Sequence, residues 1–146
     1  MIDGKVVHGE FTPLKVQGQA PPGRYGHTMC HLPTNNSILI SGGRNDELCA
    51  QNKTPFLNDL VLFLLDQKVW LNVKYSVASE RIDYVGNHCL NVVTDNESYE
   101  KILLFGGISN QVGETVADLK STISNRTFII TLQQRTTGKS LFKPMD

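Results

Sequence analysis

The chain has 146 residues, of which 40% are hydrophobic and 19% are charged. This length and composition are typical of one ordinary folded domain and do not suggest a disordered chain. Lysine plus arginine equals aspartate plus glutamate at 14 each, so no net charge attracts phosphate backbones or anionic membranes, and we expect neither nucleic acid nor a membrane as a partner.

The first half of the chain predicts a series of short strands. Residues 5–16 predict a short or edge strand, because β-branched and aromatic residues there are interrupted by glycine and proline. Residues 17–23 are rich in proline and glycine and predict a loop. A strand over 24–32 then leads through a hairpin-type turn at 33–36 into an aliphatic run, residues 37–43, that closes in two glycines.

A polar connection over 44–55 follows, in which no convincing helix is expected. It leads to a strongly apolar strand over 57–66 and, after a turn, to a fourth strand over 69–73 that carries the single tryptophan. Four strands in a row without an intervening helix predict one meandering antiparallel sheet.

The second half repeats this order less completely. A fourth strand is expected around 135–137, where Thr137 stands in the position that Trp70 has in the first half. A helical turn is conceivable around 116–120. The other expected elements are a strand over 81–93, a turn over 94–100, an aliphatic run ending in two glycines over 101–107, a polar connection over 108–124 and a strand over 125–132.

The two aliphatic runs indicate an internal repeat. Each is an unbroken apolar segment without helical spacing, as in a strand that is covered on both faces. Each ends in a glycine pair, Gly42-Gly43 and Gly106-Gly107. Because glycine lacks Cβ, such a pair permits positive φ and a close approach of neighbouring backbone. Two such segments in similar surroundings point to two copies of one structural unit.

These residues resemble kelch repeats. That family's unit is a four-stranded blade with a glycine doublet closing its second strand, and the resemblance covers residues 11–132. In the first unit the motif positions are Arg24, Gly26, His27, Gly42, Gly43, Asn58, Asp59 and Trp70. In the second unit they are Arg81, His88, Gly106 and Gly107, where Arg81 and His88 stand further apart than Arg24 and His27 and no tryptophan follows.

The resemblance implies an all-β fold, a kelch-type β-propeller fragment built from four-stranded antiparallel blades. Propellers have about four to eight blades, whereas this chain supplies two to two and a half, so the ring is incomplete and we expect further blades from the same or another chain. Residues 1–146 then form a single partial propeller. Its parts are an outer strand of a preceding blade at 5–16, a first blade at 24–73, a degenerate second blade at 81–137 and a tail at 138–146.

The motif residues are expected to have structural roles. Arg24 is expected to hold neighbouring strands and loops rather than an anion, and Trp70 to be a packing anchor rather than a ligand platform. His27 and His31 would lie on the opposite face of their strand from Cys30, so we expect no metal site and no cofactor. No catalytic sequence motif is present, and we expect no enzyme activity.

The long loops are the better candidates for recognition, because loops on a rigid scaffold commonly bind partners. Simple variable insertion is the alternative. The candidate partner-binding residues are Arg44, Asn45, Asp46, Glu47, Leu48, Phe56, Ser109, Asn110 and Val112.

The sequence therefore predicts a non-enzymatic protein-interaction or scaffold module of kelch type. One alternative is a structural subunit of a large, for example cytoskeletal, complex. Another is a fragment of a galactose-oxidase-like copper propeller, which needs a metal cluster drawn from more blades than are present here. The N-terminus lacks the features of a signal peptide, and the three scattered cysteines suit a reducing compartment, so a cytoplasmic location with cytoskeletal association is the expectation.

Overall fold

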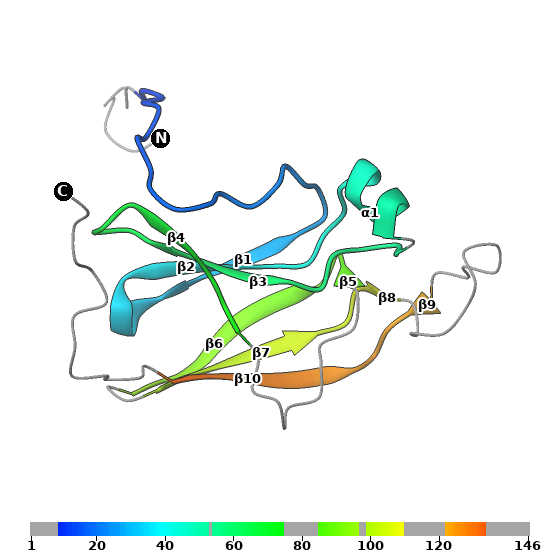
Figure 1. Cartoon of the computed structure of the whole chain (residues 1–146). Coiled ribbons are helices and arrows are strands. Elements are labelled where there is room, and N and C mark those ends of the chain that lie inside the picture. Colours follow the sequence, from blue (N-terminus) through cyan, green and yellow to red (C-terminus); the bar gives the residue numbers. More distant parts are fainter. Residues whose placement is uncertain (1–8, 53, 75–84, 97–98, 110–121, 134–146) are drawn as a thin grey trace, which may run out of the picture.

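The computed structural model describes residues 9–52, 54–74, 85–96, 99–109 and 122–133. They form short antiparallel strands and one short helix (Figure 1). The elements are β1 (Thr28–Leu32), the 3-10 turn η1 (Pro33–Asn35), β2 (Ser37–Ser41), α1 (Asp46–Asn52), β3 (Leu60–Leu64), β4 (Val69–Asn72), β5 (Val85–Gly86), β6 (Cys89–Asn96), β7 (Tyr99–Phe105), β8 (Ile108–Ser109), β9 (Thr122–Ile123) and β10 (Thr127–Gln133).

The first sheet has four strands in the order β1-β2-β3-β4, each antiparallel to the next. This is the meander that the sequence predicts for residues 24–73. Pro33 starts the turn between β1 and β2, and Asn36, at φ 46°, ends it in the left-handed conformation that asparagine tolerates better than most residues.

The second sheet repeats the first three strands of this arrangement. Its order is β10-β7-β6, so β7 lies between β6 and β10 as β2 lies between β1 and β3 in the first sheet. Both pairings of β7 are antiparallel, and the register with β6 shifts between Val92 and Thr94 as in a β-bulge. A small third sheet, β5-β8-β9, lies at the end of the molecule where β7 finishes (Figure 1).

The hydrophobic core lies between the two larger sheets, which stack as two layers with β1 packed against β6 (Figure 1). Alternate residues of each strand point inward, so Leu39 of β2 and Ile102 of β7 are both fully buried. Burial of each such side chain contributes about 1.5–3 kcal/mol. The buried core residues are Leu32, Leu39, Leu60, Val85, Leu90, Ile102, Leu104 and Ile130.

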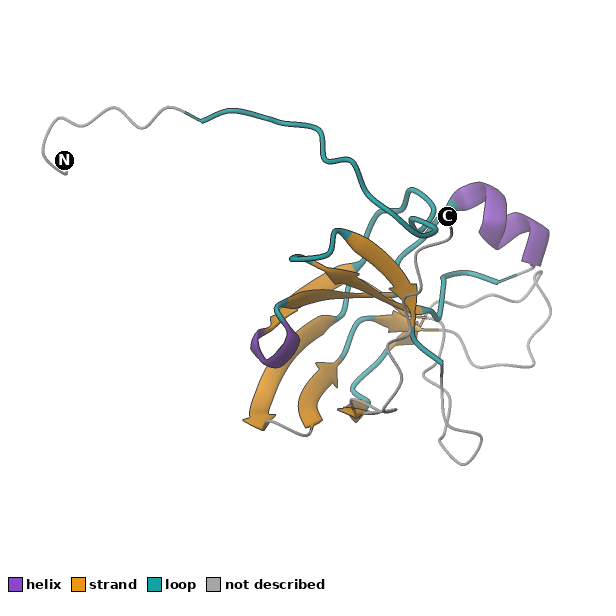
Figure 2. Ribbon diagram, turned by 60° about the vertical axis from the view of Figure 1, so that its left-hand side comes forward, coloured by secondary structure: helices purple, strands orange, loops and turns teal. Residues whose placement is uncertain are grey.

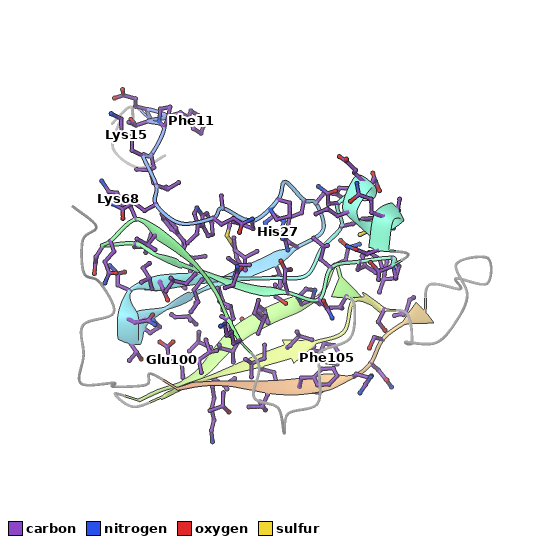
Figure 3. All side chains as sticks on the ribbon, in the orientation of Figure 1. Phe11, Lys15, His27, Lys68, Glu100 and Phe105 are labelled. Carbon is purple, nitrogen blue, oxygen red and sulfur yellow. The ribbon has the colours of Figure 1, made fainter. Side chains whose placement is uncertain are left out.

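A buried carboxylate also joins the layers. Glu100 of β7 is 3% exposed and accepts a hydrogen bond from the backbone N–H of Thr34, at 2.8 Å. Thr34 belongs to η1, so this bond ties the β1–β2 turn of the first sheet to the second sheet. Figure 3 shows Glu100 in the space between the two layers.

The outer faces of the two sheets differ. On the first sheet Val61 and Phe63 are buried, and the Phe63 ring contacts the Trp70 ring at a centroid distance of 4.6 Å. On the second sheet Phe105 and Ile129 remain 51% and 54% exposed. Among the described residues, the second sheet therefore presents a half-exposed apolar face.

Three sequence predictions about local structure are wrong. Residues 9–16 form no strand, and only Gln17 pairs with the neighbouring sheet, through a bridge to Val69. The connection after Gly43 contains α1, which the sequence was not expected to form. The predicted turn over 94–100 is mostly strand, because β6 extends to Asn96 and β7 begins at Tyr99.

The prediction of an all-β fold is confirmed apart from α1 and η1, and the two large sheets do not close into a ring in the described part of the chain. No helix among the described residues is long and apolar enough to cross a membrane. Several predicted features lie outside the described residues: 5–8, Arg81, Asn110, Val112, the helical turn at 116–120, the strand at 135–137 and the tail at 138–146.

Candidate interaction site

The two glycine doublets lie at the same end of the molecule, where β2 and β7 finish (Figure 1). All four glycines have positive φ, 58° and 88° in the first doublet and 72° and 90° in the second. A Cβ on Gly42 would lie 2.3 Å from the carbonyl oxygen of Val85, and one on Gly107 would lie 2.6 Å from that of Gly86. Any other residue would collide with backbone at these two positions.

The segment 85–88 runs between the two doublets. The N–H of Gly43 donates to the carbonyl of Val85 at 2.9 Å, which joins the first unit to the second through backbone. Gly86 in turn lies under the Phe56 ring, since a Cβ there would be 2.6 Å from two ring carbons. We call this contact region, formed by the two doublets and residues 85–88, the glycine junction.

Arg24 holds one side of the junction. Its Nη1 and Nη2 donate to the two carboxylate oxygens of Asp59 at 2.6 and 2.8 Å, and Nη1 also donates to the carbonyl of Gly42 at 3.0 Å. The Arg24 side chain is 4% exposed, so the bidentate ion pair is well shielded on its cationic side. These contacts give Arg24 a role in fixing the end of β2.

His88 is buried within the junction, at 5% exposure. Its Nε2 lies 3.2 Å from the Ser41 hydroxyl, whereas Nδ1 is buried without a hydrogen-bond partner among the described residues. Burial, and secondarily the nearby His27, lower the pKa of His88 to about 4. His88 is therefore neutral at pH 7. His27 occupies the matching position before β1 but is exposed.

The loop after the first doublet is held in place by local hydrogen bonds. Asn45 caps α1, because its Oδ1 accepts the N–H of Leu48 at 2.9 Å and its Nδ2 donates to the carbonyl of Gly23 at 2.7 Å. Cys49 anchors the helix at 1% exposure. Asparagine followed by two acidic residues is a helix-start pattern, and this was the available sequence signal for α1.

A polar cluster forms the surface beside α1. Asp46 accepts hydrogen bonds from Arg44 Nε at 2.6 Å and from the Tyr25 hydroxyl at 3.2 Å. These bonds, that of Arg44 first, lower the pKa of Asp46. Backbone bonds in both directions between Tyr25 and Arg44 position the two side chains, and the Arg44 guanidinium also donates to the carbonyl of Pro55.

The candidate partner-binding residues divide into two groups. Asp46 and Glu47 are exposed on the outer side of α1. The second group contributes mainly to the fold. In this group Phe56 packs on Gly86, and Ser109 is 7% exposed in β8. Arg44, Asn45 and Leu48 are only partly exposed. Sequence reasoning did not select Tyr25, which is 58% exposed beside Asp46. We call Tyr25, Asp46 and Glu47 the loop-end surface.

Comparison with protein-family models gave no match, and comparison with curated proteins gave none. Within the described residues, no three His, Cys, Asp or Glu side chains are grouped as metal ligands would be. The contacts at this end of the molecule form a closely packed junction that carries an exposed polar surface.

Replacing Gly42 by alanine tests the glycine junction. The new Cβ would meet the Val85 carbonyl at a positive φ, so we expect a loss of at least about 2 kcal/mol in the free energy of unfolding, measured with urea. Gly23→Ala is the matched control, because a Cβ there meets nothing within 4 Å, and it should change stability by no more than about 1 kcal/mol. Equal losses in the two variants would show that the junction is not closely packed.

The buried His88 predicts a pH dependence of stability. The unfolded chain takes up a proton near the ordinary pKa of 6.5, whereas the folded chain resists it down to about 4, so stability should fall as pH drops below 6.5. We expect up to about 2 kcal/mol of loss between pH 7 and pH 5, at about 1.4 kcal/mol per pH unit for one proton. His88→Gln should remove most of this slope, and His31→Gln, at an exposed site, should retain it. An unchanged slope in His88→Gln would show that His88 is not the source of the acid sensitivity.

Proposed function

We propose that the chain is a non-enzymatic protein-interaction or scaffold module of kelch type, belonging to a larger propeller or multi-chain assembly. The observation that carries the proposal is the pair of stacked sheets whose second strands end in left-handed glycine doublets at one end of the molecule. The four-stranded meander of the first unit and its Arg24–Asp59 pair agree with a blade of this family.

The binding surface that we propose is the loop-end surface. It is exposed. Asp46 and Glu47 belong to α1, and backbone hydrogen bonds between Tyr25 and Arg44 hold Tyr25 beside them. A preorganised surface loses little conformational entropy when it binds. With an aromatic ring next to two carboxylates, it suits a protein partner that offers basic side chains, since arginine both pairs with carboxylates and stacks on aromatic rings.

A structural subunit of a large complex is the second candidate. The half-exposed apolar face of the second sheet favours it, because an exposed patch of this kind marks a surface that another protein covers. We also propose a cytoplasmic location, because the three scattered cysteines of the sequence suit a reducing compartment.

Substitution at the loop-end surface tests the binding proposal. The full chain, immobilised, should capture a defined partner from cells of its source, and Tyr25→Ala with Glu47→Lys should weaken the affinity for that partner by at least about tenfold. Glu10→Lys is the matched control, because Glu10 is also exposed but lies outside this surface. Melting temperatures should be equal for all variants.

Two outcomes would contradict the proposal. One is capture of the same partner with unchanged affinity by the double variant, which would place binding elsewhere. The other is turnover of a substrate by the purified chain, which would contradict the non-enzymatic assignment.

A further inference from the structure

The segment 9–16 is an extended arm with exposed apolar side chains. Phe11, Leu14 and Val16 are 102%, 58% and 42% exposed. The arm is anchored where Gln17 pairs with β4, its N–H donating to the carbonyl of Lys68 at 2.8 Å and its carbonyl accepting the N–H of Trp70 at 3.0 Å. Beyond this anchor the arm leads away from the sheets (Figure 2). Its apolar side chains are thus largely exposed to water, and that of Phe11 is fully exposed.

The second sheet offers a surface of the opposite kind. Val93, Phe105 and Ile129 are 48%, 51% and 54% exposed on its outer side. The register places Leu103 opposite Ile129, so apolar side chains are contiguous across β7 and β10. We call Val93, Leu103, Phe105 and Ile129 the open face.

The arm and the open face lie on opposite sides of the molecule. Figure 3 shows Phe11 beyond the first sheet and Phe105 at the second sheet, so the first sheet lies between them. The arm points away from the open face of its own chain, but it is free to reach that of a neighbour. The chain has 14 positive and 14 negative side chains, so two copies meet no net repulsion. Glu10 on the arm also carries a charge opposite to that of Lys101, which stands on the same side of β7 as Phe105.

We propose that the arm of one copy packs on the open face of a second copy, in a head-to-tail association of this chain. The contact is heterologous, because two different surfaces meet, and it therefore extends from copy to copy or closes into a ring. The proposal rests on the proposed function only in treating the chain as part of an assembly, since the loop-end surface takes no part in it. A short arm buries less than the ~1,600 Å² of a standard interface, so the association should be weak and concentration dependent.

Cys89 provides a direct probe of the open face. It is exposed, and the register places it opposite Phe105. The other two thiols should react poorly. Cys49 is buried. The pKa of Cys30 is raised to about 11, mainly by burial and also by the nearby Glu100. Alkylation of Cys89 by iodoacetamide should therefore slow severalfold as the concentration of the full chain rises toward about 1 mM, in the range of a weak association.

Variants assign the occupant of the face. Phe11→Ser with Leu14→Ser should abolish both the concentration-dependent protection of Cys89 and the association seen by sedimentation velocity. Ile123→Ser is the matched control: Ile123 is 91% exposed but lies on β9, outside both surfaces, and this variant should behave as the unaltered chain does. Mixing the arm variant with a Phe105→Ser, Ile129→Ser variant should give a complex of two chains that grows no further, because one arm and one open face remain intact.

Two results would overturn the proposal. A chain that stays monomeric, with Cys89 equally reactive at all concentrations up to about 1 mM, has no head-to-tail contact. Association that protects Cys89 equally well in the arm variant would show that something other than the arm covers the face. Neither result bears on partner capture by the loop-end surface, which the arm variant should retain.

Discussion

The backbone contact at the glycine junction is the constraint on which the rest of the structure depends. Segment 85–88 passes so close to the doublets that a Cβ at Gly42 or Gly107 would overlap its carbonyl oxygens. This approach lets the N–H of Gly43 bond to Val85, sets the spacing of the two layers at this end and leaves His88 buried between them. The core between the sheets follows, because inward side chains such as Leu39 and Ile102 can meet only when both sheets are held at this distance.

The junction also explains why the recognition surface that we propose lies where it does. The chain leaves the first doublet directly into α1, and the backbone bonds between Tyr25 and Arg44 tie the start of the first unit to the same point. A loop fixed at both ends presents its outer residues in one arrangement, which suits binding. The arm and the open face differ from this polar surface, because their exposed side chains are apolar. Association between chains would bury them.

Much of the fold could be predicted from the sequence, because its strongest signals are local. Unbroken aliphatic runs ended by glycine pairs predicted β2 and β7, and the four-stranded meander followed from the order of strands and turns. The helix α1 was missed because only seven residues form it, and its stability comes from the Asn45 cap and from burial of Cys49 rather than from helical periodicity. The sequence did not predict that Tyr25 is exposed or that Ser109 is buried. Both depend on how distant segments pack together, which no local pattern encodes. The kelch-type ring and its partners stay predictions.

Hydrogen exchange at the Gly43 amide tests the account most directly. This N–H, bonded to Val85 at 2.9 Å, joins the two units through backbone. If the junction organises the fold, the amide should exchange only through global unfolding, with the same free energy as core amides such as that of Leu39. Exchange as fast as that of the amide of exposed Gly9 would show that the two units do not dock through this contact and would contradict the account.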